Sequence, residues 1–129
     1  MCSSDLGSGN IFSAELAKTM FDRTSCDGIL VARGSFGNPW IFKDIHRYLK
    51  YGKKTGRVSL REKGEVLKRH LLYLNTYLDC HPSSKAGIMK RVAMWYIRNI
   101  SNAKELRREI TIVKDYKKMI KLIDNIIDR

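Results

Sequence analysis

The chain lacks the features that mark several protein classes. Its 129 residues contain only three cysteines and two prolines, and no apolar run approaches the roughly 20 residues needed to cross a bilayer. No basic stretch leads into an apolar one at the N-terminus, as a secretion signal requires. Cys2, Cys26 and Cys80 have no metal-ligand spacing and predict free thiols in a reducing compartment. We therefore expect a soluble, cytoplasmic and monomeric protein without metal or membrane association.

Acidic residues are scarce, and the imbalance is uneven. The chain has 25 Lys and Arg against 13 Asp and Glu. Residues 1–42 hold three bases and four acids, a net charge of −1. Since the whole chain has a net charge of +12, residues 43–129 carry +13. A polycation of this kind attracts polyanions and binds them with release of counterions. The alternative is a surface charge that serves solubility alone.

The first third of the chain alternates between turn residues and periodic segments. Residues 7–10 form a glycine-rich turn, and Ser13 predicts the N-cap of a helix to about Arg23. The short apolar run at 29–32 is typical of a buried strand in a parallel sheet. Asn38-Pro39 predicts a helix start with proline at its first position, and this helix runs to Tyr51.

The remainder of the chain predicts a small helical bundle. A loop rich in Gly and Lys, residues 52–56, marks the expected domain boundary. Ser59 predicts a helix that stops before Pro82, Ser84 predicts a second, and a short segment at 103–108 leads to a last helix. Three amphipathic helices with short connections form such a bundle.

The turn, helix, strand and turn over residues 7–34 compose one βα unit that lacks its first strand. In (β/α)₈ barrels, the loops after strands 7 and 8 often build a phosphate site. Glycines allow backbone amides to approach a phosphate closely, and Arg33 supplies a charge-assisted bond. The alternative is that both segments are merely tight turns.

The order of these motifs is more specific than any one of them. Residues 7–49 contain G-S-G-N-I-F-S-A-E-L-A-K, then C-D-G-I-L-V-A-R-G-S-F-G-N-P-W-I-F-K-D-I and Y-L. This series closely resembles the tRNA-dihydrouridine synthase family, in its bacterial nitrogen-regulation-related branch. The resemblance implies the end of a TIM barrel of the FMN-linked oxidoreductase type. It also implies that two loops bind the FMN phosphate, with Ser8, Gly9 and Asn10 at the family's N-G-D and Ala32 and Arg33 at its G-R.

The resemblance also implies an activity and a missing group. Members of the family reduce the C5–C6 bond of uridine in tRNA, with FMN as hydride donor and NADPH to regenerate it. Their general-acid cysteine comes from an earlier barrel loop, and neither Cys26 nor Cys80 occupies a matching place. We therefore expect no catalytic residue in this chain and no activity from it alone. Residues 1–6 are unlike a buried strand and are interpreted as a non-native leader.

The helical part carries a weaker motif. Residues 90–96, K-R-V-A-M-W-Y, resemble a family stretch of the type R-K-H-x-x-W-Y, with Val92 in place of the histidine. Arg91, Trp95 and Arg98 are spaced to share one helical face. Two cations beside an indole suit an RNA backbone with an exposed base, so these residues and Lys90 are the predicted tRNA contacts. The alternative places Trp95 in the core with the arginines around it.

Together these patterns predict an α/β barrel remnant followed by an all-α bundle. The predicted segments are a leader at 1–6, the last βα unit of the flavin-binding barrel at 7–52 and a helical tRNA-binding domain at 57–129. A second hypothesis is a stand-alone basic helical module that binds nucleic acid without catalysis.

Overall fold

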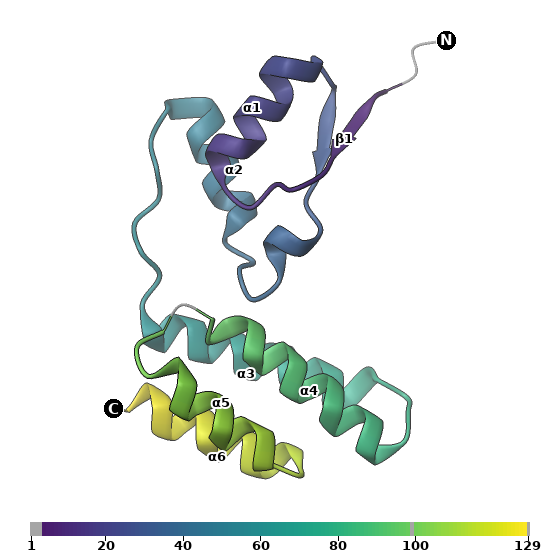
Figure 1. Ribbon diagram of the computed structural model, residues 1–129, viewed down its shortest axis with the longest axis vertical. Coiled ribbons are helices and arrows are strands. Elements are labelled where there is room, and N and C mark those ends of the chain that lie inside the picture. The colour runs from purple at the N-terminus through teal and green to yellow at the C-terminus, as the bar shows by residue number, and fades with distance from the viewer. Residues whose placement is uncertain (1–3, 99, 129) are drawn as a thin grey trace. The chain divides into compact units, whose positions relative to one another are not determined.

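The computed structural model describes residues 4–98 and 100–128. The chain divides into two compact units, unit 1 (Met1–Arg57) and unit 2 (Val58–Arg129). Unit 1 contains β1 (Leu6–Ser8), α1 (Ala14–Thr24), β2 (Gly28–Leu30), the 3₁₀ helix η1 (Arg33–Ser35) and α2 (Ile41–Tyr51) (Figure 1). The two strands pair in parallel, with Leu6 opposite Gly28 and Ser8 opposite Leu30. Because parallel neighbours need a crossover connection, α1 forms the link between them.

β1 begins one residue before the predicted barrel segment, at Leu6. The carbonyl oxygen of Asp5 accepts hydrogen bonds from the amides of Asp27 and Gly28, at 2.9 and 3.3 Å. The Asp5 amide in turn donates to the Asp27 carboxylate at 2.9 Å. The assignment of Leu6 to a leader was therefore wrong, because backbone pairing with the segment before β2 overrides the poor strand composition of this stretch.

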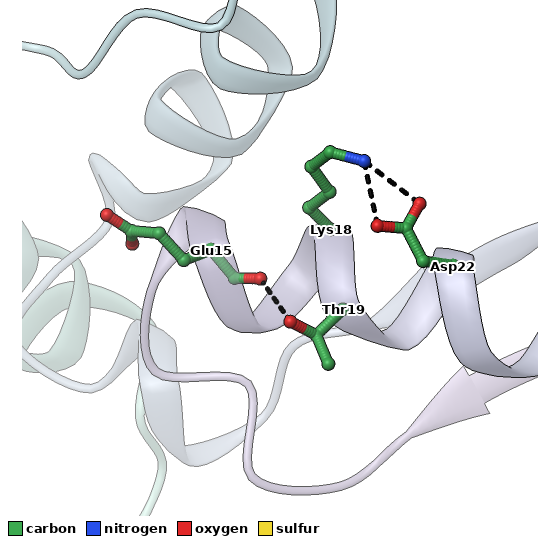
Figure 2. Close-up of polar contacts among 4 residues, drawn as sticks. All are labelled: Glu15, Lys18, Thr19 and Asp22. Carbon is green, nitrogen blue, oxygen red and sulfur yellow. Dashed lines mark hydrogen bonds and ion pairs between the residues drawn. The ribbon is translucent and has the colours of Figure 1, made fainter.

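α1 starts where its sequence predicts. The Ser13 hydroxyl accepts a hydrogen bond from the Leu16 amide at 3.3 Å, and Ser25 ends the helix in a left-handed conformation with φ of 53°. On its outward side, Lys18 pairs with Asp22 at 2.7 Å (Figure 2). Small residues on the other side allow close packing, and the unit's buried core consists of Ile11, Ala14, Ala17, Ile41 and Ile45.

α2 starts two residues later than predicted. Its N-cap is Trp40, and its first helical residue is Ile41, so Pro39 precedes the helix instead of opening it. The residues before it form successive turns, in which the Asn38 amide donates to the Ser35 carbonyl at 3.0 Å and the Ile41 amide to the Asn38 carbonyl at 3.3 Å. The Asn38 backbone is thus engaged in a turn, and no side chain caps the helix.

The segment after α2 is attached to α1 by an ion pair. Lys54 contacts the Glu15 carboxylate, and the hydrogen bond from Lys54 lowers the pKa of Glu15 to about 2. Figure 2 shows the Glu15 carboxylate directed away from the Lys18–Asp22 pair, while the Thr19 hydroxyl donates to the Glu15 carbonyl at 3.0 Å. The pair is exposed, so its contribution to stability is small.

In the described part of unit 2 there are four helices rather than the three predicted. They are α3 (Leu60–Tyr77), α4 (Pro82–Tyr96), α5 (Ala103–Ile112) and α6 (Tyr116–Ile127). The predicted last helix begins only at Tyr116, because the Asp115 carboxylate caps it by accepting from the Lys118 amide at 2.9 Å. α4 begins at Pro82 and not after Ser84, since proline suits the first helical position and the His81 ring accepts from the Ser83 amide.

The core of unit 2 is built from one face of each helix. Gly64 of α3 faces Ile127 of α6 so closely that an added Cβ would lie 2.3 Å from the isoleucine Cδ1. Lys68 links the same two helices, with Nζ 2.8 Å from Glu65 and 2.9 Å from Asp124. The buried hydrophobic residues are Leu67, Leu71, Met89, Val92, Ala93, Tyr96, Ile97, Leu106, Ile110, Met119, Ile123 and Ile126.

One backbone approach in unit 1 requires glycine. Gly34 is buried within η1, and a Cβ added there would lie 1.9 Å from the Ile11 carbonyl oxygen. A backbone atom cannot move aside as a side-chain terminus can. The segment that follows β2 therefore packs directly against the segment that follows β1.

We predict that Leu71→Ala destabilises unit 2 by about 2–5 kcal/mol, because the Leu71 side chain is 0% exposed in the core. The measurement is urea unfolding followed by Trp95 fluorescence in a Trp40→Phe background. Leu72→Ala is the matched control: this neighbour on the same helix is 47% exposed and should change stability by no more than about 0.5 kcal/mol. Equal losses for both variants would contradict the assigned core.

We predict that Gly34→Ala destabilises unit 1 by about 1–3 kcal/mol, because the methyl group overlaps the Ile11 carbonyl. Trp40 fluorescence in a Trp95→Phe background reports unfolding of this unit. Gly56→Ala is the control, since open space surrounds Gly56, and it should be neutral or stabilising by up to about 1 kcal/mol. An unchanged urea midpoint for Gly34→Ala would refute the close approach.

Candidate functional sites

The predicted cofactor residues lie in two neighbouring turns of unit 1. Parallel pairing places the segments after β1 and β2 at the same edge of the strand pair. Ser8 ends β1, and Gly9 and Asn10 follow with φ of 129° and 50°. A positive φ is readily adopted by glycine and tolerated by asparagine, which explains these residue types at this turn.

Arg33 and Asn10 connect the two turns directly. The Arg33 Nη2 donates a hydrogen bond to the Asn10 Oδ1 at 3.1 Å, across 23 residues of sequence. The guanidinium carbon also lies 5.9 Å from the centroid of the Phe12 ring. No carboxylate in residues 4–98 or 100–128 pairs with Arg33, so its positive charge is not neutralised within the described chain.

Ala32 shapes the second turn through its backbone. Its carbonyl oxygen accepts from the Ser35 amide at 3.0 Å and from the Ser35 hydroxyl at 2.7 Å. Ala32 itself is exposed, like Ser8, Gly9, Asn10 and Arg33. The five predicted residues thus occupy adjacent, solvent-accessible turns.

Two contributors to these turns were missed from the sequence. Phe12 lies beside the Arg33 guanidinium, and Gly34 permits the close approach to the Ile11 carbonyl. The position of Gly34 just after a predicted strand could have indicated a turn with a close backbone approach. Phe12 had no such signal, because its contact spans two turns.

The predicted RNA-binding residues fall on α4 and just beyond it. Arg91 is exposed on α4, and Trp95 is half-buried on the same helix. Arg98 is also exposed but follows Ile97, which is the C-cap, so helical spacing does not fix its direction. The common helical face therefore comprises Arg91 and Trp95, and Arg98 belongs to the following turn.

Lys90 has a structural role that the sequence did not reveal. Its Nζ donates to the Thr111 carbonyl at 2.7 Å, in the last turn of α5. A lysine at this place satisfies an orphan carbonyl and interacts favourably with the negative end of the helix dipole. Its ammonium is thus partly engaged by α5, unlike the exposed arginines.

Within the described ranges, no helix is both long and apolar enough to span a membrane. In the same ranges, no three His, Cys, Asp or Glu side chains gather as a group that could hold a metal ion. The half-buried His70 lies 3.4 Å from the Tyr96 hydroxyl, and burial lowers the pKa of this histidine. His70 therefore favours its neutral form between α3 and α4.

Comparison with known proteins matches almost the whole chain to one family. The sequence profile described as Dihydrouridine synthase (Dus) matches residues 6–129. This match begins at Leu6, the first residue of β1, and continues through both units. The family has a TIM-barrel-type fold, to which the parallel strand pair and its crossover helix conform.

Individual relatives give the same result. A probable tRNA-dihydrouridine synthase of Mycobacterium tuberculosis (strain CDC 1551 / Oshkosh) is 30% identical over 124 residues, which are 94% of this chain and 31% of that protein. The tRNA-dihydrouridine synthase B of Pasteurella multocida is 29% identical over 115 residues, 89% of this chain and 34% of its own length. A probable tRNA-dihydrouridine synthase of Aquifex aeolicus is 27% identical, over 96% of this chain and 37% of its own.

The chain thus spans about a third of the length of the curated relatives it matches. The strand pair, the two turns that it aligns and the helical unit all fall within the matched region. On this continuous match, the chain belongs to the dihydrouridine synthase family.

Proposed function

We propose that this chain is the C-terminal part of a tRNA-dihydrouridine synthase, which reduces uridine to 5,6-dihydrouridine in tRNA with FMN and NADPH. The observation that carries the proposal is the Arg33–Asn10 pair, located where two parallel strands end, in a chain that matches the family across both units. A stand-alone nucleic-acid-binding module is less well supported, since the match includes the strand-bearing unit.

The two turns of unit 1 fit the phosphate end of FMN. Arg33 offers a positive charge, and the Asn10 side chain orients it. Gly9 has open space where a Cβ would stand, so a phosphate can approach the backbone there. Ser8 and Ala32 complete the proposed cofactor contacts through exposed main chain on either side.

FMN supplies the hydride for reduction of the uridine C5–C6 bond when it is bound. The residues of this chain serve only to hold its phosphate and to contact tRNA. Among the described residues, Cys26 precedes β2 and Cys80 follows α3, and neither occupies the turns that contain Arg33 and Asn10. We accordingly propose that the 129-residue chain is inactive without the rest of the barrel.

The helical unit is the proposed tRNA-binding part. Residues 58–129 contain 16 Lys and Arg against eight Asp and Glu. Arg91 and Arg98 are exposed and form no ion pair among the described residues, which makes them available to phosphates. Trp95 is half-buried on the helical face of Arg91 and offers an aromatic surface, and Lys90 adds charge on the same helix.

We predict that Arg91→Gln and Arg98→Gln each weaken tRNA binding about three- to tenfold and reduce the salt dependence by about one counterion. Filter binding at several salt concentrations measures both quantities. Lys121→Gln removes the same charge from the exposed side of α6 and should have a smaller effect. Salt-insensitive binding, or arginine variants equal to the wild type, would exclude this surface as the tRNA contact.

We predict that the purified chain retains far less than one FMN per molecule, because most walls of the cofactor site lie in parts that only the longer relatives contain. Flavin absorbance relative to protein concentration measures the ratio. The Pasteurella multocida relative, purified in the same way, is the positive control. A yellow preparation of this chain with stoichiometric FMN would contradict the prediction.

A further inference from the structure

A cleft of about 460 Å³ opens at one end of unit 2. Its walls come from the end of α3, the loop that follows it, the first turns of α4 and the start of α6. The α3–α4 loop and the α5–α6 connection lie at the same end of this unit (Figure 1). The volume falls within the range of sites for small organic ligands, which is about 300–1,000 Å³.

The cleft is lined by three lysines and one carboxylate. Lys85, Lys114 and Lys117 contribute the positive charges, and Asp115 contributes the negative one. The Asp115 carboxylate is already occupied: it accepts from the Lys118 amide at 2.9 Å and lies 3.6 Å from the Lys118 Nζ. The interior of the cleft therefore favours an anion.

The lysines themselves are not neutralised. No carboxylate in the described ranges forms an ion pair with Lys85, Lys114 or Lys117. Lys85 donates instead to the Asn75 carbonyl at 3.1 Å, which holds its ammonium against the wall that α3 provides. Three uncompensated cations around one cleft match a phosphate better than a neutral ligand.

Apart from the charged residues, Asn75 and Cys80, the residues that line the cleft are apolar or aromatic. Pro82, Ala86 and Met89 form one side, and Met89 also belongs to the buried core. Tyr116, at the first turn of α6, is half-buried in the opposite wall. A phosphate alone leaves such a wall uncovered, whereas a nucleotide places its base or ribose there.

The cleft is distinct from the surface formed by Arg91 and Trp95. Lys85 and Met89 are one turn apart on α4, while Arg91 is two residues beyond Met89, a rotation of about 200° around the helix. The two surfaces consequently lie on opposite sides of α4. A change in one need not alter the other.

We propose that this cleft binds one nucleotide of the bound RNA, with its phosphate among Lys85, Lys114 and Lys117 and its base or sugar against the apolar wall. The assignment rests on the proposed binding of tRNA to residues 58–129, and it adds a second contact to that binding. The ligand is a nucleotide that carries a phosphate, within an RNA strand.

Cys80 lines the cleft and provides a direct reporter of its occupancy. Cys26 lies in unit 1, is also partly buried, and serves as an internal control in a Cys2→Ser background. Alkylation of both thiols by iodoacetamide is followed by mass spectrometry in the presence of tRNA, uridine 5′-monophosphate or uridine. Filter binding on the same samples shows whether tRNA is bound.

We expect tRNA and uridine 5′-monophosphate to slow alkylation of Cys80 about fivefold or more at saturation, since a phosphate held by three lysines covers the thiol. Uridine should give no protection, and Cys26 should react equally in all samples. Lys114→Gln/Lys117→Gln should abolish the protection. The matched control Lys104→Gln/Lys121→Gln removes the same charge from exposed positions outside the cleft and should retain it.

Bound tRNA that leaves Cys80 unprotected overturns the cleft assignment and leaves tRNA binding intact. Equal loss of protection in both double variants also overturns it, because the net positive charge of the protein, and not the lysines of the cleft, would then account for the protection. Absence of tRNA binding overturns the proposed function instead, and the uridine 5′-monophosphate samples then decide whether the cleft holds a nucleotide phosphate. Protection by the free nucleotide but not by bound tRNA refutes the RNA occupant.

Discussion

Unit 1 depends on the parallel pairing of two three-residue strands. Such a pair needs a crossover helix, and its strands are stable only when both faces are covered. α1 supplies the crossover and packs against both strands. Leu6 and Leu30 remain 61% and 55% exposed, so the burial predicted for the apolar run at 29–32 is not complete within unit 1. The same pairing brings Asn10 and Arg33 together, so the geometry of the turns follows from the register of the strands.

Local signals predicted the elements that local interactions decide. Ser13 and Ser59 cap α1 and α3 through hydrogen bonds to amides three residues ahead, which sequence spacing reveals. Competing or distant partners decided the other boundaries. A turn engages Asn38 and delays α2, and the Asp115 cap separates α5 from α6. Asp5 and Asp27 bond to each other just before Leu6 pairs with Gly28 in the strand pair. The helix and strand propensities of single residues do not indicate these hydrogen-bond partners.

In the candidate sites, too, the sequence indicated the local features but not the contacts between distant segments. The two turns were predicted together, because parallel strands end at a common edge and because their motifs occur in the order that the family shows. The tertiary contacts within and around them were not predicted: Phe12 beside Arg33, the backbone contact at Gly34 and the Lys90 bond to α5 each join segments distant in sequence. The cationic cleft likewise depends on how α4 and α6 are juxtaposed, and no motif marks it.

In the proposed cofactor site, the hydrogen bond between Asn10 and Arg33 affects the entropy of phosphate binding. A free arginine side chain has many rotamers, and fixing them on binding costs about 1.5–2 kcal/mol. Because Asn10 and the Phe12 ring already restrict this guanidinium, much of that cost falls on folding and not on association. In the proposed cofactor site, Asn10 is thus a pre-organising residue: it carries no charge itself, but it holds the Arg33 guanidinium in place for the phosphate.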